Sequence, residues 1–217
     1  VAQCLDIIEA YIVRRNICSL QNAGFTNFFR GMWKACGHKP NPQELLRKLI
    51  PEFETCSPDI DETPHAGETP KDLVGRLAIA KAKAVAAHFP SALIIASDQV
   101  SVLNDKINGK PGNQQQAFLQ LKASSGNTVT FFTSLCLYDA STHRSELVVE
   151  PFHVHFRHLK DDEINRYLDK EAPFNCAGSF KSEGLGISLF RKLEGDDPNA
   201  LIGLPLIKLA DLLRNQG

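Results

Sequence analysis

Apolar residues follow two different spacings along this chain, and each spacing predicts one kind of element. From Leu73 to Val85 they recur every three or four residues, behind Thr69 as an N-cap and Pro70 at the first helical position, which predicts an amphipathic helix. Residues 93–96 form a continuous apolar run typical of a buried strand. Residues 128–138 are rich in Val, Thr and Phe and predict a long strand.

Weaker forms of the same signals occupy the segments around these elements. The sequence predicts helices over 45–50, 114–122, 161–170 and 205–214, an extended segment over 53–57, a hairpin over 100–107, and a strand over 147–156 that pairs with 128–138. Strands and helices mix without strict alternation and without internal repeats. This arrangement favours an α/β or α+β fold with a mixed sheet.

Residues 1–43 differ from the rest of the chain. Residues 6–15 predict a short amphipathic helix, residues 22–37 lack periodicity, and residues 38–42 are a breaker cluster. We therefore expect two parts: an atypical, partly disordered or artefactual segment over 1–43 and one domain over 44–217. The chain starts with Val, and a frameshift, a wrong start site or a diverged terminus would each account for the unusual segment.

Composition limits the classes of partner. The 217 residues carry a formal net charge of −1, so no global basic field attracts nucleic acid or an anionic membrane, and no apolar run is long enough to cross a bilayer. The six cysteines form no C-x-x-C pair and are too sparse for a disulfide scaffold. We expect a cytoplasmic protein with reduced thiols, bound to neither nucleic acid nor membrane.

The tripeptide Ser97-Asp98-Gln99 follows the apolar run 93–96 and is the main candidate for chemistry. A carboxylate at the end of a buried strand can hold a divalent metal or take a proton from water on a rigid support. The alternative is ordinary turn chemistry, because Asp is common after strands.

Three further charged residues extend this candidate site. Glu62 lies in a polar turn, Lys81 on the long predicted helix, and Lys110 in Asn108-Gly109-Lys110-Pro111. Two carboxylates with two lysines suit metal-assisted phosphoryl chemistry, in which the carboxylates hold Mg²⁺ or activate water and the lysines bind phosphate oxygens. The alternative is scattered charge on a solvated surface.

Six short blocks of sequence occur in a fixed order. They are Asp61-Glu62-Thr63-Pro64, Leu77-Ala78 with Lys81-Ala82, Ser97-Asp98-Gln99-Val100, Gly109-Lys110-Pro111, Cys176-Ala177-Gly178-Ser179-Phe180 and Ile202-Gly203-Leu204-Pro205-Leu206. Together they resemble the Maf-type nucleoside triphosphate pyrophosphatases, and the resemblance runs from Leu45 to the C-terminus. It implies an α/β fold similar to that of inosine triphosphatases, with a mixed twisted sheet flanked by helices and two lobes around a central cleft. It also implies a divalent cation (Mg, Mn or Co), a cytoplasmic homodimer, and cleavage of a nucleoside triphosphate to monophosphate and pyrophosphate.

The resemblance assigns roles to residues of these blocks. Asp98 resembles the catalytic acid that activates water or holds the metal, with Glu62 as a second metal ligand and Lys81 and Lys110 as the phosphate clamp. The pair Gln99 and Glu183 is similar to the subgroup that acts on 7-methyl-GTP. A carboxylate accepts hydrogen bonds from the N1–H and N2–H edge of guanine and offsets the positive charge of the methylated ring.

One departure from the family concerns the Ser-x-Ser-Pro-x-Arg-Arg loop, which contacts phosphate. The corresponding segment is Lys39-Pro40-Asn41-Pro42-Gln43, which lacks both arginines, and Asn41 stands where the subgroup has a bulky specificity residue. Loss of the family's first strand is expected to leave a sheet edge or a gap. Three functions follow: a 7-methyl-GTP pyrophosphatase, a catalytically impaired nucleotide-binding or regulatory protein, or an enzyme for damaged purine triphosphates such as inosine triphosphate.

Overall fold

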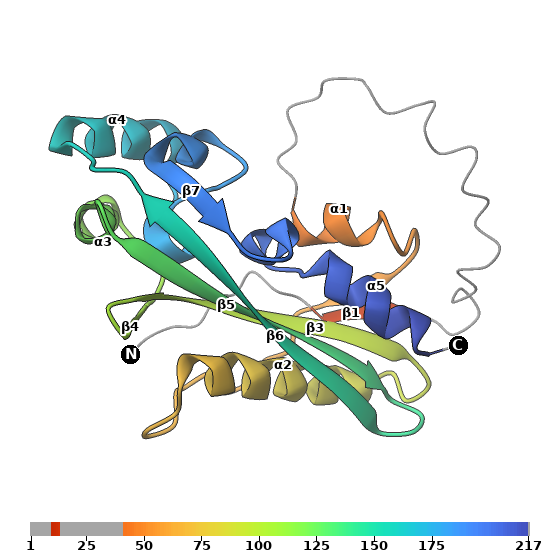
Figure 1. The fold of residues 1–217 in the computed structure, drawn as a ribbon. Helices are drawn as coiled ribbons and strands as arrows, with labels where there is room; N and C mark the ends of the chain where they lie inside the picture. The colour runs from red at the N-terminus through yellow and green to blue at the C-terminus, as the bar shows by residue number, and fades with distance from the viewer. Residues whose placement is uncertain (1–9, 14–40, 217) are drawn as a thin grey trace, which may run out of the picture.

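A computed structural model describes residues 10–13 and 41–216, which fold around a seven-stranded sheet (Figure 1). The strand order is β2-β1-β3-β5-β6-β7, with β4 paired to β3, and each pairing between these strands is antiparallel. The elements are β1 Ala10–Val13, α1 Pro42–Leu46, β2 Glu54–Cys56, α2 Pro70–Ala86, β3 Leu93–Leu103, β4 Lys106–Asn108, α3 Gln114–Ser124, β5 Thr128–Asp139, β6 Arg144–Phe156, α4 Asp161–Glu171, β7 Phe190–Glu194 and α5 Leu206–Arg214. Three short 3₁₀ helices, η3 Ala177–Ser179, η4 Leu185–Leu189 and η5 Pro198–Ile202, complete the described elements.

Helices cover both faces of the sheet at the end where β1 lies. Because side chains alternate along a strand, Ile94 packs with Ala78 of α2 on one face, whereas Ile95 packs with Leu45 of α1 and Leu209 of α5 on the other. Figure 1 shows α2 below the sheet and α1 and α5 above it. The predicted sheet flanked by helices is confirmed.

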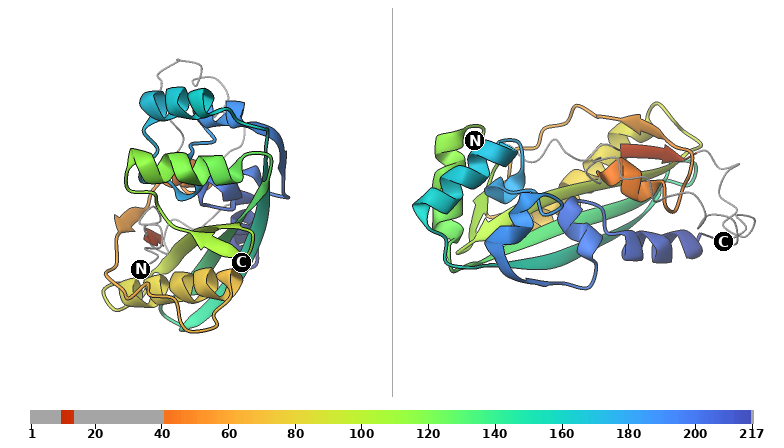
Figure 2. Two further views of the ribbon diagram at one scale, coloured as in Figure 1. Left: turned by 90° about the vertical axis from the view of Figure 1, so that its left-hand side faces the viewer. Right: turned by 90° about the horizontal axis from the view of Figure 1, so that it is seen from above.

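A separate core forms at the other end of β5 and β6, where α3 and α4 lie side by side (Figure 2). Phe131, Phe156 and Phe180 form its aromatic centre, with ring centroids of neighbouring pairs 5.4 and 5.7 Å apart. Long strands thus connect two lobes, each with its own apolar cluster. The two-lobed architecture agrees with the expectation from the family.

The helix expected over residues 6–15 is wrong for the part that the structure describes. Ala10–Val13 is a strand between β2 and β3, antiparallel to both, and its four residues are fully buried. The rest of the expected helix lies outside the described residues. The gap expected from a missing first strand is therefore filled, because the edges of β2 and β3 supply backbone partners that a four-residue apolar segment can use.

The remaining predicted elements agree with the structure to within a few residues. Thr69 caps α2 by accepting a hydrogen bond from the backbone N–H of Asp72 at 3.2 Å. Residues 128–138 and 147–156 lie in β5 and β6, with His153 and Val154 on opposite faces. Within the residues that the structure describes, no helix combines the length and apolar character needed to cross a membrane.

Strand β1 can be tested by truncating one buried side chain. Ile12 is 1% exposed, so Ile12→Ala should lower the free energy of unfolding by about 2–5 kcal/mol, as expected for a cavity in a packed core. Ile207, which is 50% exposed on α5, provides the matched control, and Ile207→Ala should change little. Urea unfolding measures both. Equal effects of the two substitutions would show that Ile12 is not packed in the sheet.

Candidate active site

Asp98 lies in the middle of a strand and not at the end of one. The apolar run stops at residue 96, but the ladder with β5 continues through Asp98, opposite Ser134, to Val102. Pairing with the neighbouring strand, which composition does not reveal, decides where β3 ends. The expectation that the buried strand ends at Asp98 is therefore wrong: the strand continues, and the Asp98 side chain is fully buried and faces α2.

The structure brings Glu62, Lys81 and Asp98 into direct contact. The Nζ atom of Lys81 lies 2.6 Å from Oδ1 of Asp98 and 2.8 Å from Oε1 of Glu62. Exposure of the side chains rises from 0% for Asp98 through 4% for Lys81 to 20% for Glu62. The cluster therefore runs from the core to the surface, and Glu62 is the member that solvent reaches.

Lys81 remains charged in this setting. Burial alone lowers the pKa of the ammonium group, but the carboxylates of Asp98 and Glu62 outweigh burial and raise the pKa above its ordinary value. An ammonium group has three N–H donors, and these two carboxylates are its partners among the described residues. One donor remains for a further acceptor.

The loop before α2 is fixed by an ion pair that sequence reasoning missed. Arg76 donates from Nε and Nη2 to the two carboxylate oxygens of Glu68 at 2.6 and 2.9 Å, and Nη2 also donates to the carbonyl of Thr63 at 3.1 Å. The hydrogen bond from Arg76 lowers the pKa of Glu68 to about 2. Because Thr63 follows Glu62, this clamp holds Glu62 toward Lys81. The i, i+8 spacing of the pair gives no helical signal that would have revealed it.

Lys110, the fourth charged candidate, lies on the loop after β4. Asn108 of β4 is paired with Ser101, three residues beyond Asp98, so the loop belongs to the same edge of β3. The carbonyl of Gly109 accepts a hydrogen bond from Gln120 of α3 at 3.0 Å, which anchors the backbone beside Lys110. Three of the four predicted charges thus meet, and the fourth lies along the same strand edge.

The donor set fits a divalent cation that also binds phosphate. Glu62 and Asp98 carry two negative charges against the one positive charge of Lys81, and carboxylate oxygens are the ligands that Mg²⁺ prefers. Among the described residues, no cluster of three or more His, Cys, Asp or Glu side chains is suited to a metal. Mg²⁺ commonly binds one or two carboxylates together with substrate phosphates, so two suffice.

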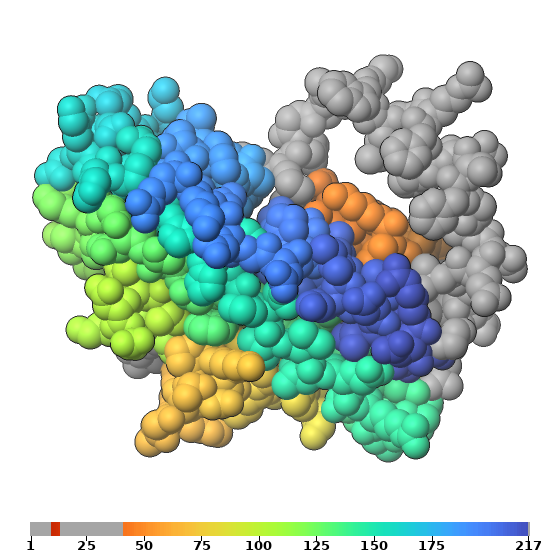
Figure 3. Space-filling model, in the orientation of Figure 1, coloured from red at the N-terminus to blue at the C-terminus, as the bar shows by residue number. Residues whose placement is uncertain are grey.

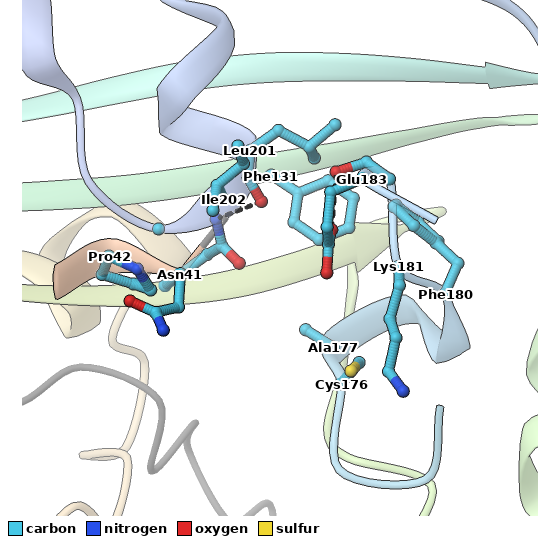
Figure 4. A pocket seen from close by; sticks show the side chains of 13 residues that line it. Asn41, Pro42, Phe131, Cys176, Ala177, Phe180, Lys181, Glu183, Leu201 and Ile202 are labelled. Atoms are coloured by element: carbon cyan, nitrogen blue, oxygen red, sulfur yellow. Dashed lines mark hydrogen bonds between the residues drawn. The ribbon is translucent and has the colours of Figure 1, made fainter. Parts of the chain in front are cut away.

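A pocket on the opposite face of β3 brings together the three predicted specificity residues. Asn41, Gln99 and Glu183 all line it, with Phe131 and Phe180 among its apolar walls (Figure 4). Its volume is about 150 Å³, below the roughly 300–1,000 Å³ of pockets that enclose a whole drug-sized ligand. The space suits one ring system, with the rest of a ligand outside.

Asn41 and Gln99 are held by hydrogen bonds to other groups of the protein. Asn41 caps α1, its Oδ1 accepting from the N–H of Glu44 at 2.9 Å. Gln99 is 7% exposed, and its Nε2 donates to the hydroxyl of Thr133 and to the carbonyl of Ala200 in η5, both at 2.8 Å. In the space-filling view, α1 packs directly beside η5 and α5 (Figure 3). One wall of the pocket is therefore built from segments far apart in sequence.

The loop that carries Glu183 is fastened to α4. The hydroxyl of Tyr167 accepts a hydrogen bond from the backbone N–H of Lys181 at 3.0 Å. The Nζ atom of Lys181 donates to the backbone carbonyl of Glu171 at 2.8 Å. The carboxylate of Glu171 accepts from the backbone N–H of Leu185 at 3.1 Å. At Gly186 a Cβ would lie 2.3 Å from the carbonyl oxygen of Lys181, so this close turn requires glycine. Only Glu183 was predicted from sequence among these residues.

The charged cluster and the pocket lie on the two faces of β3, at the neighbouring residues Asp98 and Gln99. On the side of β3 away from β5, β1 pairs with Leu93–Ile95 and β4 pairs with Ser101–Leu103. No described strand pairs with residues 96–100 on that side, although these residues are buried. One short stretch of β3 therefore connects the ionic cluster to the pocket.

Comparison with known proteins supplies the family. The family model described as Maf-like protein matches residues 40–216. The chain belongs to the Maf-like protein family. Proteins named 7-methyl-GTP pyrophosphatase from Colwellia psychrerythraea and Nitrosococcus oceani are each 54% identical to it over 178 residues, which is 82% of this chain and 89% of each relative. The match includes every predicted site residue and begins near the boundary expected at residue 44, whereas β1 lies outside it.

Removal of the buried ammonium tests the charged cluster. Lys81→Met should lower the free energy of unfolding by about 3–5 kcal/mol, because it removes the ammonium group that pairs with the buried carboxylate of Asp98. Lys83→Met, an exposed lysine two residues along the same helix, should change stability by less than about 0.5 kcal/mol. Urea unfolding at neutral pH measures both. Similar values for the two variants would contradict the buried ion pair.

The raised pKa of Lys81 also predicts behaviour in alkali. Because the pKa in the folded protein exceeds the ordinary value of a lysine, the stabilisation from Lys81 is fully present below that ordinary value and is lost as the pH rises through the folded value. Glu62→Gln removes one carboxylate that raises this pKa, so the alkaline loss of stability should begin at lower pH. Urea unfolding between pH 9 and 12 measures the onset, with Glu52→Gln on the exposed surface as control. An unchanged onset in Glu62→Gln would contradict this coupling.

Proposed function

We propose that this chain hydrolyses 7-methyl-GTP to 7-methyl-GMP and pyrophosphate. The observation that carries the proposal is the placement of a carboxylate–lysine cluster and a small ring-sized pocket on the two faces of β3, at the neighbouring residues Asp98 and Gln99. The relatives named 7-methyl-GTP pyrophosphatase support the same substrate, since they match over most of both chains. No comparison favours the impaired alternative.

In this proposal the pocket binds the base. The carboxylate of Glu183 accepts hydrogen bonds from the N1–H and N2–H groups of guanine, and its negative charge offsets the positive charge of the 7-methylated ring. Thymine and uracil offer a single N–H donor on this edge and suit a carboxylate less well. Asn41, the N-cap residue of α1, lines the same pocket and is our candidate for a further contact with the base.

The charged cluster acts on the phosphates. Water attacks the α-phosphorus, the bond from that phosphorus to the bridging oxygen of the β-phosphate breaks, and pyrophosphate leaves. The carboxylate of Asp98 takes the proton of the attacking water. Lys81 keeps Asp98 and Glu62 together and has one N–H donor left for a phosphate oxygen, and Lys110 supplies a second positive charge.

A divalent cation completes this arrangement. Glu62 and Asp98 would hold it, and when bound it neutralises phosphate charge and lowers the pKa of water. Glu62 is the more exposed carboxylate, so we expect the cation and the phosphates to approach from its side. The choice among Mg, Mn and Co, the homodimer and the cytoplasmic location stay predictions.

The reaction is tested by incubating the protein with Mg²⁺ and a panel of 7-methyl-GTP, GTP, ITP, UTP and dTTP. We expect the highest kcat/KM with 7-methyl-GTP and equal amounts of 7-methyl-GMP and pyrophosphate by chromatography. Release of orthophosphate in place of pyrophosphate, or no release of pyrophosphate from any triphosphate, would refute the proposal. Added chelator should abolish turnover.

The role of Asp98 is tested with a neutral side chain of the same shape. Asp98→Asn should lower kcat by about 10²–10⁴-fold, the usual contribution of a general base. Asp105, in the turn between β3 and β4, provides the matched control, and Asp105→Asn should leave kcat unchanged. A kcat within threefold of the parent in Asp98→Asn would exclude Asp98 as the base.

A further inference from the structure

The side-chain amide of Gln99 is held in one orientation by hydrogen bonds to groups of β5 and η5, with the carbonyl of Leu201 a weaker third acceptor at 3.4 Å. Its Nε2 donates to the hydroxyl oxygen of Thr133 at 2.8 Å and to the carbonyl oxygen of Ala200 at 2.8 Å. An amide nitrogen has two hydrogens, and these two acceptors take both. Both hydrogens of Nε2 are therefore hydrogen-bonded within the protein.

The hydroxyl of Thr133 makes the opposite orientation unfavourable. It donates its single hydrogen to the carbonyl of Ala200 at 2.9 Å, so toward Gln99 it presents a lone pair and acts as an acceptor. A flipped amide would place Oε1 against the carbonyl oxygen of Ala200 with no hydrogen between them, and the single hydroxyl hydrogen of Thr133 could then serve Oε1 or that carbonyl but not both. Leaving such buried groups unsatisfied costs free energy.

What remains for the pocket is Oε1, which can only accept. Gln99 lines the pocket, whereas Thr133 is fully buried on β5 and is not among the lining residues. We propose that Thr133 is a positioning residue: by fixing the amide of Gln99, it makes the pocket present an acceptor and so favour a base whose edge carries N–H donors. This inference rests on the proposed function and deepens it.

The chemical consequence is discrimination between two classes of purine. Guanine presents three N–H donors on this edge, one at N1 and two at N2, so the acceptor Gln99 Oε1 adds to the two acceptor oxygens of Glu183. Adenine presents an unprotonated ring nitrogen at the same position, which faces an oxygen and gains no hydrogen bond. Once the lock is weakened, the amide can turn its NH₂ group toward the pocket, and adenine nucleotides are then bound better.

The test compares Thr133→Val, which has nearly the same shape but no hydroxyl, with the parent. We expect the ratio of kcat/KM for 7-methyl-GTP to that for ATP to fall about 3–10-fold, the range of one hydrogen bond, with the change in KM and not in kcat. Thr133→Ser should restore the parent ratio. Thr130→Val is the control, since Thr130 lies on the same strand with its hydroxyl bonded to His153 on the opposite face.

The outcomes distinguish failure of the positioning role of Thr133 from failure of the proposed function. An active Thr133→Val enzyme with the parent ratio, or a Thr133→Ser enzyme that resembles Thr133→Val, overturns the positioning role and leaves the proposed function intact. If Thr133→Val does not fold, Thr133→Ala provides the same hydroxyl-free comparison. If the parent releases no pyrophosphate, the proposed function fails. Calorimetry with 7-methyl-GMP and AMP then measures the ratio of the two binding affinities in place of the kinetic ratio. Equal affinity of the parent for these two monophosphates would overturn the inference.

Discussion

The contact on which the site depends is the buried ammonium of Lys81 between the carboxylates of Asp98 and Glu62. A fully buried carboxylate is tolerated in a strand only when a counterion and hydrogen bonds replace water. Lys81 supplies that counterion from α2, and the helix is positioned by the apolar side chains that pack on the same face of the sheet. The pair therefore links the packing of α2 to the charge that the site can offer a cation or a phosphate.

Strand β3 gives this site two different faces. Asp98 and Gln99 are neighbours in sequence, so the alternation of a strand sends one toward the ionic cluster and the other toward the pocket. In our proposal a single nucleotide uses both faces, with its base at Gln99 and its phosphates at the ionic cluster. A rigid, central strand is well suited to this task, because ten residues of β3 are paired with β5 and hold both side chains in fixed positions.

Outside β3, the site depends on loops held by side chains that do not bind ligand in our proposal. Arg76 and Glu68 position Glu62, and Tyr167 and Glu171 position the turn that carries Glu183. Polar groups in these loops are satisfied by specific partners, which stabilise the observed arrangement of each loop. Precision at the site is therefore obtained from contacts several residues away from it.

The sequence by itself determined the chemistry-bearing residue types and most of the elements, because helix caps, apolar spacing and short motifs are local signals. Thr69 and Pro70 mark the start of α2, and Glu62, Lys81 and Asp98 stand out as charges in or beside predicted elements. Only the tertiary structure decided that Ala10–Val13 is a strand, that β3 continues through Asp98, and that Thr133 and η5 fix Gln99. These three features depend on partners far away in sequence. Pairing between distant segments produces no periodic pattern of apolar residues in either segment, so the sequence does not reveal it.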